Sequence, residues 1–221
     1  MSKKKNEAIA PDEALSKAEA FVIKHKTAFI AVIVAIIAFA AFQAFTPESS
    51  ESKGNNEADA AVAKVEHLVL AGNYDIALEG NDEIEGLLEI IEKYSGTSAA
   101  NKANLFAGIA YAQKKQYNDA ITYLSQYNGS DNIAAANAKH LLGTCYSQIE
   151  EYEKAISTVL EAAALADNAG ITPLCWRDAA AMYEVLGNDK EAMNLYNRIK
   201  NEYPYSPVAE EAELKINAAA K

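Results

Sequence analysis

The hydrophobic and polar positions along the chain follow two different patterns. Thr27 to Phe45 form an uninterrupted run without a charged side chain, TAFIAVIVAIIAFAAFQAF. From residue 57 onward, apolar residues instead recur at helical spacing, and glycine, asparagine, proline and serine are confined to short turns. No stretch alternates as a half-buried β-strand would. The pattern predicts an all-α chain in which one continuous apolar segment precedes a region of amphipathic helices.

The apolar run has the length of a membrane span. As a helix it would measure about 28 Å, close to the hydrocarbon thickness of a bilayer. Lys24 and Lys26 precede it and a polar, acidic stretch follows it. The positive-inside rule therefore predicts a single-pass protein with residues 1–26 in the cytoplasm and the remainder across the membrane. Two alternatives stay open, a buried core helix and a signal peptide cleaved after Ala40.

Three segments of the helical region can be superimposed on one another. They are NLFAGIAYAQKKQYNDAITYLSQY (104–127), KHLLGTCYSQIEEYEKAISTVLEA (139–162) and WRDAAAMYEVLGNDKEAMNLYNRI (176–199). In each, a small residue stands three positions before a tyrosine, and a second small residue follows on the next helix. These positions are Gly108, Tyr111 and Ala120, then Gly143, Tyr146 and Ala155, then Ala180, Tyr183 and Ala192. Small residues let two helices cross closely, and pairs of this kind must stack to bury their apolar faces.

This pattern resembles the tetratricopeptide repeat (TPR) family. The residues that carry the resemblance in the third repeat are Trp176, Tyr183, Gly187, Ala192, Tyr196 and Pro204. The sequence departs from the family pattern where Asn104 and Lys139 occupy the tryptophan position. The resemblance identifies residues 99–205 as three TPR-like repeats. It implies an α-solenoid of antiparallel helix pairs that binds other proteins.

Turn signals divide the rest of the helical region. Residues 46–56, TPESSESKGNN, predict a flexible polar linker. Residues 57–98 predict a degenerate N-terminal helical pair, with helices at 57–71 and 83–94. At the other end, residues 206–221 predict a C-terminal capping helix, in which Ser206 is the N-cap and proline occupies the first turn.

Charge and composition argue against several classes of binding and catalytic activity. The net charge is −11, and most of the acidic excess lies after the apolar run, which argues against nucleic-acid binding. Cys145 and Cys175 are interpreted as small core residues on neighbouring helices, with a single bridge or a redox pair as the alternative. The histidines have no metal-ligand spacing, and His140 and Cys145 share a helix face too poorly to act as a base and a nucleophile. We therefore expect no cofactor, no metal and no enzymatic activity.

The resemblance also indicates where partners would bind. In TPR domains the first helix of each repeat lines a concave groove, which accepts an extended segment or a helix of the partner. The groove residues predicted here are Lys102, Gln113, Asn137, His140, Thr144, Gln148, Arg177 and Glu184. The alternative is that these are ordinary solvated side chains.

The whole layout resembles that of YfgM-like ancillary subunits of the Sec translocon. A short basic segment, one N-terminal span and a small acidic TPR domain make up that resemblance. It implies a bacterial inner-membrane protein with its TPR domain in the periplasm, where it contacts the translocon, emerging chains or chaperones. The alternatives are a scaffold of another cell-envelope complex, in division or outer-membrane assembly, and a secreted binding module released by signal cleavage.

Overall fold

The computed structural model describes residues 48–219 of the chain. The predicted cytoplasmic segment (1–26) and the predicted membrane span (27–45) lie outside the described residues, so both stay predictions. Within 48–219, none of the helices combines the length and the apolar character that a membrane crossing requires.

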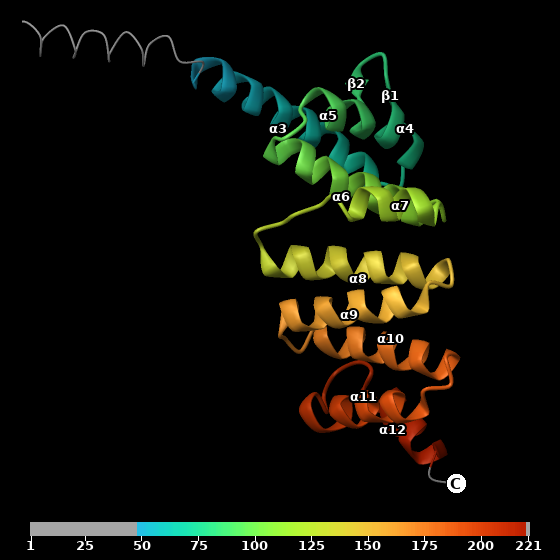
Figure 1. Cartoon of the computed structure of the whole chain (residues 1–221). Helices are drawn as coiled ribbons and strands as arrows, with labels where there is room; N and C mark the ends of the chain where they lie inside the picture. The colour runs from blue at the N-terminus through green and yellow to red at the C-terminus, as the bar shows by residue number, and fades with distance from the viewer. Residues whose placement is uncertain (1–47, 220–221) are drawn as a thin grey trace, which may run out of the picture. The chain divides into compact units, whose positions relative to one another are not determined.

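The described residues form a series of antiparallel helices stacked in chain order, with one short hairpin of strands (Figure 1). The helices are α3 (Glu48–Leu70), α4 (Tyr74–Glu79), α5 (Leu87–Lys93), α6 (Ser98–Gln113), α7 (Tyr117–Leu124), α8 (Asn132–Gln148), α9 (Tyr152–Ala166), α10 (Thr172–Val185), α11 (Asp189–Glu202) and α12 (Ala209–Ala219). The strands β1 (Gly80–Asn81) and β2 (Ile84–Glu85) pair antiparallel between α4 and α5. The prediction of a TPR-like solenoid of helix pairs is confirmed.

The helix pairs share one type of turn. In α3–α4, α6–α7, α8–α9 and α10–α11, a residue with positive φ follows the first helix. These residues are Gly72, Lys115, Glu150 and Gly187. The next residue donates its N–H to a carbonyl five positions back, as Gln116 does to Tyr111 at 2.9 Å. This Schellman arrangement satisfies the last carbonyls of the first helix and reverses the chain. The α3–α4 turn is therefore built like the turns of the three predicted repeats.

Glycines set how closely the paired helices approach. A Cβ on Gly108 of α6 would lie 2.5 Å from Cγ of Leu124 on α7. A Cβ on Gly143 of α8 would lie 2.5 Å from Cγ1 of Val159 on α9. The small residues predicted on the second helices, Ala120, Ala155 and Ala192, are fully buried. The small positions of the repeat pattern therefore lie at helix crossings, as the spacing indicates.

The predicted linker at 46–56 is corrected by the structure, because α3 already begins at Glu48. Further along α3, a buried stripe recurs at helical spacing, formed by Ala58, Val62, Val65 and Val69. Once packing holds that part as a helix, extending the helix backward needs no new nucleation. The polar composition of the stretch indicated a linker, but it does not prevent the stretch from continuing an established helix.

The N-terminal pair also differs from the prediction of helices at 57–71 and 83–94. Its second half is α4, then the β1–β2 hairpin, then the short α5. The side-chain oxygen of Asn81 accepts two backbone N–H groups of the hairpin turn, at 2.9 and 3.0 Å. A Cβ on Gly86 would lie 2.4 Å from the carbonyl oxygen of Leu78, so the two ends of the hairpin meet closely. The expectation that this region has no strand is wrong. Each strand has only two residues, which are too few to show the alternation that predicts a strand.

The C-terminal helix begins later than predicted. Ser206 is not its N-cap, because α12 starts at Ala209 and the intervening residues form turns. Val208 and Ala212 are nonetheless buried, and Ile216 packs against the same cluster. The helix therefore covers the apolar side of α11, as a capping helix would.

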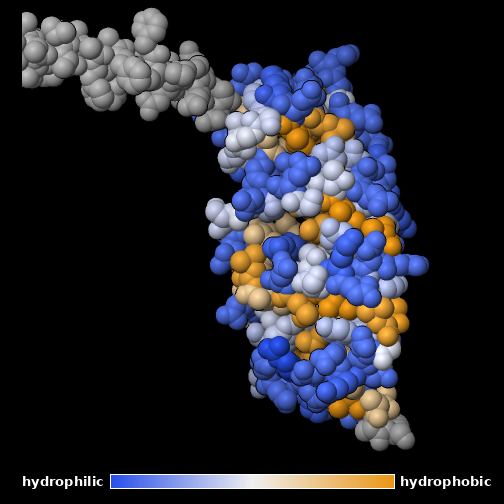
Figure 2. All heavy atoms as spheres, in the orientation of Figure 1, coloured by the Kyte–Doolittle hydropathy of each residue, from blue (hydrophilic) through white to orange (hydrophobic). Residues whose placement is uncertain are grey.

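The hydrophobic core is divided along the stack. One cluster extends from Ala58 to Ala110 through α3–α6, and a second extends from Ala155 to Ala212 through α9–α12. Between them lies a small cluster whose buried members are Ala120, Leu124 and Cys145. On the face drawn in Figure 2, hydrophobic residues reach the surface in bands across the stack, between layers of polar residues.

Candidate protein-binding groove

A cleft of about 510 Å³ lies between the first helices of the second and third repeats, α8 and α10. Its polar lining consists of Thr144, Ser147, Gln148, Arg177 and Asp178. Its apolar lining consists of Tyr152, Val159, Ala181, Met182 and Val185. The Val185 side chain is the most open of these and is 63 % exposed. A cleft of this size suits a few side chains of a docked segment rather than a whole helix.

A chain of hydrogen bonds and ion pairs links the helices at one side of the cleft. The carboxylate of Asp178 contacts Nε2 of His140 at 2.6 Å and accepts a hydrogen bond from Nε of Arg177 at 2.6 Å. Arg177 also reaches Glu211 of α12 at 3.4 Å. Asp178 is only about one-quarter exposed, so these contacts are less screened than surface pairs. They hold α8, α10 and α12 in register around the cleft.

The far end of α10 is tied to the capping helix as well. Lys215 of α12 donates to the Glu184 carboxylate at 2.6 Å, and its ammonium lies 5.9 Å from the ring centre of Tyr196. Burial raises the pKa of the Tyr196 hydroxyl to about 12, so this phenol stays neutral at physiological pH. The contact between Lys215 and Glu184 therefore ties α12 to the end of α10 that carries Val185 of the cleft.

The predicted groove residues do not all lie together. The cleft contains Thr144, Gln148 and Arg177, and His140 borders it through its contact with Asp178. Asn137 is exposed on α8, where its amide donates to the carbonyl of Ile133 at 3.0 Å. Of the other three, Glu184 is paired with Lys215, and Lys102 and Gln113 are exposed on α6. None of these three lines the cleft. The partner-binding role of all eight stays a prediction.

Asp178 is the charged residue of this site that the sequence analysis missed. It stands beside Arg177 on α10, 38 residues after His140 along the chain. No local pattern pairs two residues at that separation. The sequence offered one signal for Asp178. It directly follows Arg177, a predicted groove residue on the first helix of a repeat.

The two cysteine thiols have low reactivity. Cys145 and Cys175 are both free and buried, which confirms their interpretation as small core residues. Burial raises the pKa of Cys145 to about 11 and that of Cys175 to about 12. At neutral pH both are thiols rather than thiolates, and thiols are weak nucleophiles. Among residues 48–219, no cluster of three or more histidine, cysteine or acidic side chains is arranged to hold a metal ion.

Comparisons with known proteins agree with this geometry. Residues 179–206, which include the second half of α10 and all of α11, match the tetratricopeptide repeat family. Among solved structures, the chain is similar to the TPR-like repeats of a protein described as a kinesin light chain from Podosopora anserina. The TM-score is 0.55 at 13% sequence identity, and the alignment covers 75% of this chain and 85% of that one. A comparison with curated proteins gave no match.

Proposed function

We propose that this chain, whose stacked helix pairs have the tetratricopeptide-repeat fold, is a scaffold that binds protein partners and is tethered to a membrane by residues 27–45. The single observation that carries the binding role is the cleft between α8 and α10. There, polar groups and an exposed valine lie on helices that the contact between His140 and Asp178 links. A preorganised cleft binds a partner segment with a smaller entropic cost than a mobile surface does.

The cleft favours a partner segment with mixed chemistry. Val185 and Ala181 offer an apolar contact, whereas Thr144 and Gln148 offer hydrogen bonds. The Asp178 carboxylate is already paired with Arg177 and His140, so it adds little free charge. A segment that inserts a few apolar and polar side chains into the cleft, either extended or from one face of a helix, meets these requirements.

The tether determines where this binding takes place. The lysines before residue 27 support an orientation with the N-terminus in the cytoplasm and the repeats in the periplasm of a bacterium. Confinement near the inner membrane raises the effective concentration of the repeats for membrane-bound partners, so moderate affinity is sufficient. The layout supports partners at the Sec translocon or among periplasmic chaperones. In this proposal the chain acts by binding alone and catalyses no reaction.

Site-directed photo-crosslinking of the full-length chain in intact bacterial cells tests the proposal. A photoreactive amino acid at Gln148 should give discrete adducts with envelope proteins, because Gln148 lines the cleft. The matched control is Ser157, which is exposed on α9 outside the cleft. Adding Val185→Asp to the Gln148 probe should remove the adducts without unfolding the chain, because Val185 is largely exposed.

Other outcomes of the crosslinking experiment would lead to different conclusions. Equal adducts from Gln148 and Ser157, or adducts that survive Val185→Asp, would contradict the cleft as the binding site. Adducts with division or outer-membrane assembly proteins would place the scaffold in another envelope complex. A secreted version that lacks residues 27–45 should give a weaker adduct signal at equal abundance, and an undiminished signal would contradict the role of the tether.

A further inference from the structure

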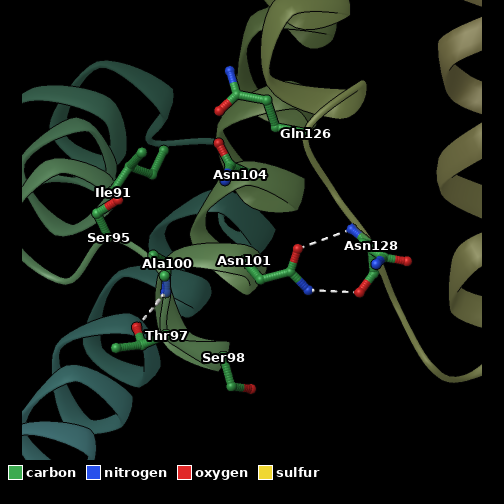
Figure 3. A pocket seen from close by; sticks show the side chains of 10 residues that line it. Ile91, Ser95, Thr97, Ser98, Ala100, Asn101, Asn104, Gln126 and Asn128 are labelled. Atoms are coloured by element: carbon green, nitrogen blue, oxygen red, sulfur yellow. Dashed lines mark hydrogen bonds between the residues drawn. The ribbon is translucent and has the colours of Figure 1, made fainter.

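The loop between α7 and α8 contains the one asparagine of the sequence that a glycine follows, in the pair Asn128 and Gly129. Asn128 is exposed, and residues 127–129 belong to no helix, strand or turn. Asn128 also borders a hollow of about 450 Å³ where α6 begins and α7 ends, so solvent reaches it (Figure 3). Asparagine is among the thermally labile residues of proteins, because the next main-chain nitrogen can attack its side-chain amide. Glycine leaves that nitrogen unhindered and the backbone free to rotate.

The two groups that would react are both free. Among residues 48–219, no group accepts the N–H of Gly129, and the side-chain amide of Asn128 makes no hydrogen bond. Asn168, in the loop between α9 and α10, differs in this respect. Its Oδ1 accepts the N–H groups of Gly170 and Ile171 at 2.8 and 2.9 Å. An amide held in this way cannot turn toward the next main-chain nitrogen, whereas that of Asn128 can.

The main chain of Asn128 is anchored to the start of α6. Asn101 donates from Nδ2 to the carbonyl of Asn128 at 2.9 Å, and its Oδ1 accepts the N–H of the same residue at 2.8 Å (Figure 3). Three residues further on, Asp131 is the N-cap of α8, and its carboxylate accepts the N–H of Ala134 at 2.8 Å. The segment from Asn128 to Asp131 is therefore fixed at both ends. It connects the first repeat to the second.

We propose that Asn128 deamidates spontaneously in the folded protein, and that its isoaspartate product loosens the connection between α7 and α8. A hydroxide ion removes the proton of the Gly129 N–H, and the nitrogen attacks Cγ of Asn128. The Cγ–Nδ2 bond breaks, and the amide nitrogen takes a proton from water and leaves as ammonia. Water then opens the succinimide ring at either carbonyl, which gives aspartate or isoaspartate. The net reaction consumes water and releases ammonia, and nothing is oxidised or reduced.

Isoaspartate changes the path of the main chain. The chain then runs from Cα of residue 128 through Cβ and Cγ to Gly129, so the link to Asp131 becomes one bond longer. The original carbonyl carbon becomes a carboxylate on the same Cα, where Asn101 still reaches it. The anchor is thus kept while the connection beyond it becomes slack. Both products also place a negative charge near the Asp131 carboxylate, and like charges repel.

The position of the loop gives the modification its effect. The core cluster at α7 and α8 is the small one that contains Leu124 and Cys145, so few buried residues compensate for a slack connection. Deamidation is irreversible and accumulates with time, so it marks the age of each molecule at this junction. The inference does not rest on the function proposed for the cleft between α8 and α10, which Asn128 does not line.

Mass spectrometry of the full-length chain in detergent micelles tests the modification. The protein is aged at body temperature in mildly alkaline buffer and digested with trypsin, which releases residues 116–139 as one peptide. This peptide should gain the mass that corresponds to replacement of an amide by an acid, and fragmentation should place the gain at Asn128. Three other asparagines of the peptide lie in α7 and α8 and should stay unmodified, namely Asn118, Asn132 and Asn137. A methyltransferase specific for isoaspartate should methylate aged protein and not fresh protein.

Matched variants separate the local sequence from the structure. Gly129→Ala should slow the conversion several-fold, because a methyl group then stands beside the attacking nitrogen. Its Cβ would meet only the side chain of Tyr127, whose hydroxyl end can move. Ala169→Gly gives Asn168 the same following residue at an exposed position. Asn168 should still stay unmodified in that variant, because its amide is held by two N–H groups.

Urea unfolding tests the structural consequence. Aged protein should lose part of its far-ultraviolet circular dichroism at a lower urea concentration than fresh protein. The fluorescence transition of Trp176 should stay in place, because Trp176 belongs to the C-terminal cluster. Asn128→Asp adds the charge without the extra bond, so its shift should be smaller than that of aged protein.

The proposal is overturned if Asn128 stays intact in the folded protein while the urea-unfolded chain deamidates. It is also overturned if Asn168 in the Ala169→Gly variant reacts as fast as Asn128, since a free side chain would then not matter. Identical urea transitions of fresh and isoaspartate-containing protein would overturn the loosening of the junction. Crosslinking from Gln148 bears on the cleft alone, so the two proposals stand or fall separately.

Discussion

At the residue scale, the turns between paired helices depend on one backbone conformation. Gly72 and Gly187 adopt positive φ without cost, whereas Lys115 and Glu150 adopt it with a side chain at φ of 60° and 64°. L-residues disfavour this region because Cβ approaches the following carbonyl. The second repeat therefore contains a small local strain that the third repeat avoids.

This strain predicts opposite effects for two matched substitutions. Glu150→Gly should raise the free energy of unfolding by about 0.5–1 kcal/mol, because relief of the strain exceeds the added flexibility of the unfolded chain. Gly187→Ala should lower it by about 1 kcal/mol, since a Cβ there meets no atom within 4 Å and only the backbone conformation is strained. Urea denaturation followed by circular dichroism measures both. Destabilisation by Glu150→Gly would show that the Glu150 side chain stabilises the fold by more than the backbone strain costs.

At the element scale, α12 ends the stack by covering α11. Val208 and Ala212 are buried against residues that include Tyr196 and Ile199. Lys215 and Glu213 add ion pairs to α10 and α11. Without a covering helix, the last repeat would expose its apolar face to water.

A pair of charge substitutions on α12 tests this covering role. Ala212→Glu should lower the free energy of unfolding by roughly 3 kcal/mol, because it buries an unpaired carboxylate at a fully buried position. Leu214→Glu is the control on the same helix, and its effect should stay within about 0.5 kcal/mol because the side chain is 64 % exposed. Thermal melts of both variants measure the difference. Equal melting temperatures would mean that α12 does not pack as described.

At the scale of the whole helical region, stability is distributed unevenly along the stack. Among residues 48–219, the two large core clusters are separate, and the small cluster that contains Ala120, Leu124 and Cys145 lies between them. Each helix pair contacts mainly its neighbours, so a weak junction limits how cooperatively the two halves unfold. The α7–α8 junction is the weak point, because α7 ends at Leu124 and is shorter than α9 or α11.

We therefore expect the two halves to unfold at different urea concentrations. Trp176 is the only tryptophan and lies in the C-terminal cluster, so its fluorescence reports that half alone. Far-ultraviolet circular dichroism reports all helices, and its transition should be broader than that of the fluorescence. Ala120→Gly, which weakens the junction, should separate the two transitions further. Coincident transitions in both proteins would indicate one cooperative unit.

Much of the fold could be predicted from the sequence, because repeat proteins are stabilised by contacts between segments that are close in the chain. The small residues and tyrosines at offsets of 35 and 37 predicted the helix pairs within 99–205. The structure places Gly108 and Gly143 at the expected crossings. The turn at Gly72 was also recognisable, since its Gly-Asn-Tyr sequence echoes the later repeats.

The candidate site could be predicted only in part. The resemblance to TPR domains selected the first helices of the repeats, and the cleft does contain Thr144, Gln148 and Arg177. It gave no means of separating these from Lys102 and Gln113, which have the same polarity and the same kind of position on α6.

The sequence by itself determined the all-α class, the order of the helix pairs and the long apolar segment ahead of them. These features depend on periodicity and on turns, which are local properties of the chain. Only the tertiary structure decided that Asp178 joins His140 to Arg177, and that Asn104 is buried without a partner. Such contacts depend on the distance and angle between packed helices, and no short stretch of sequence specifies them.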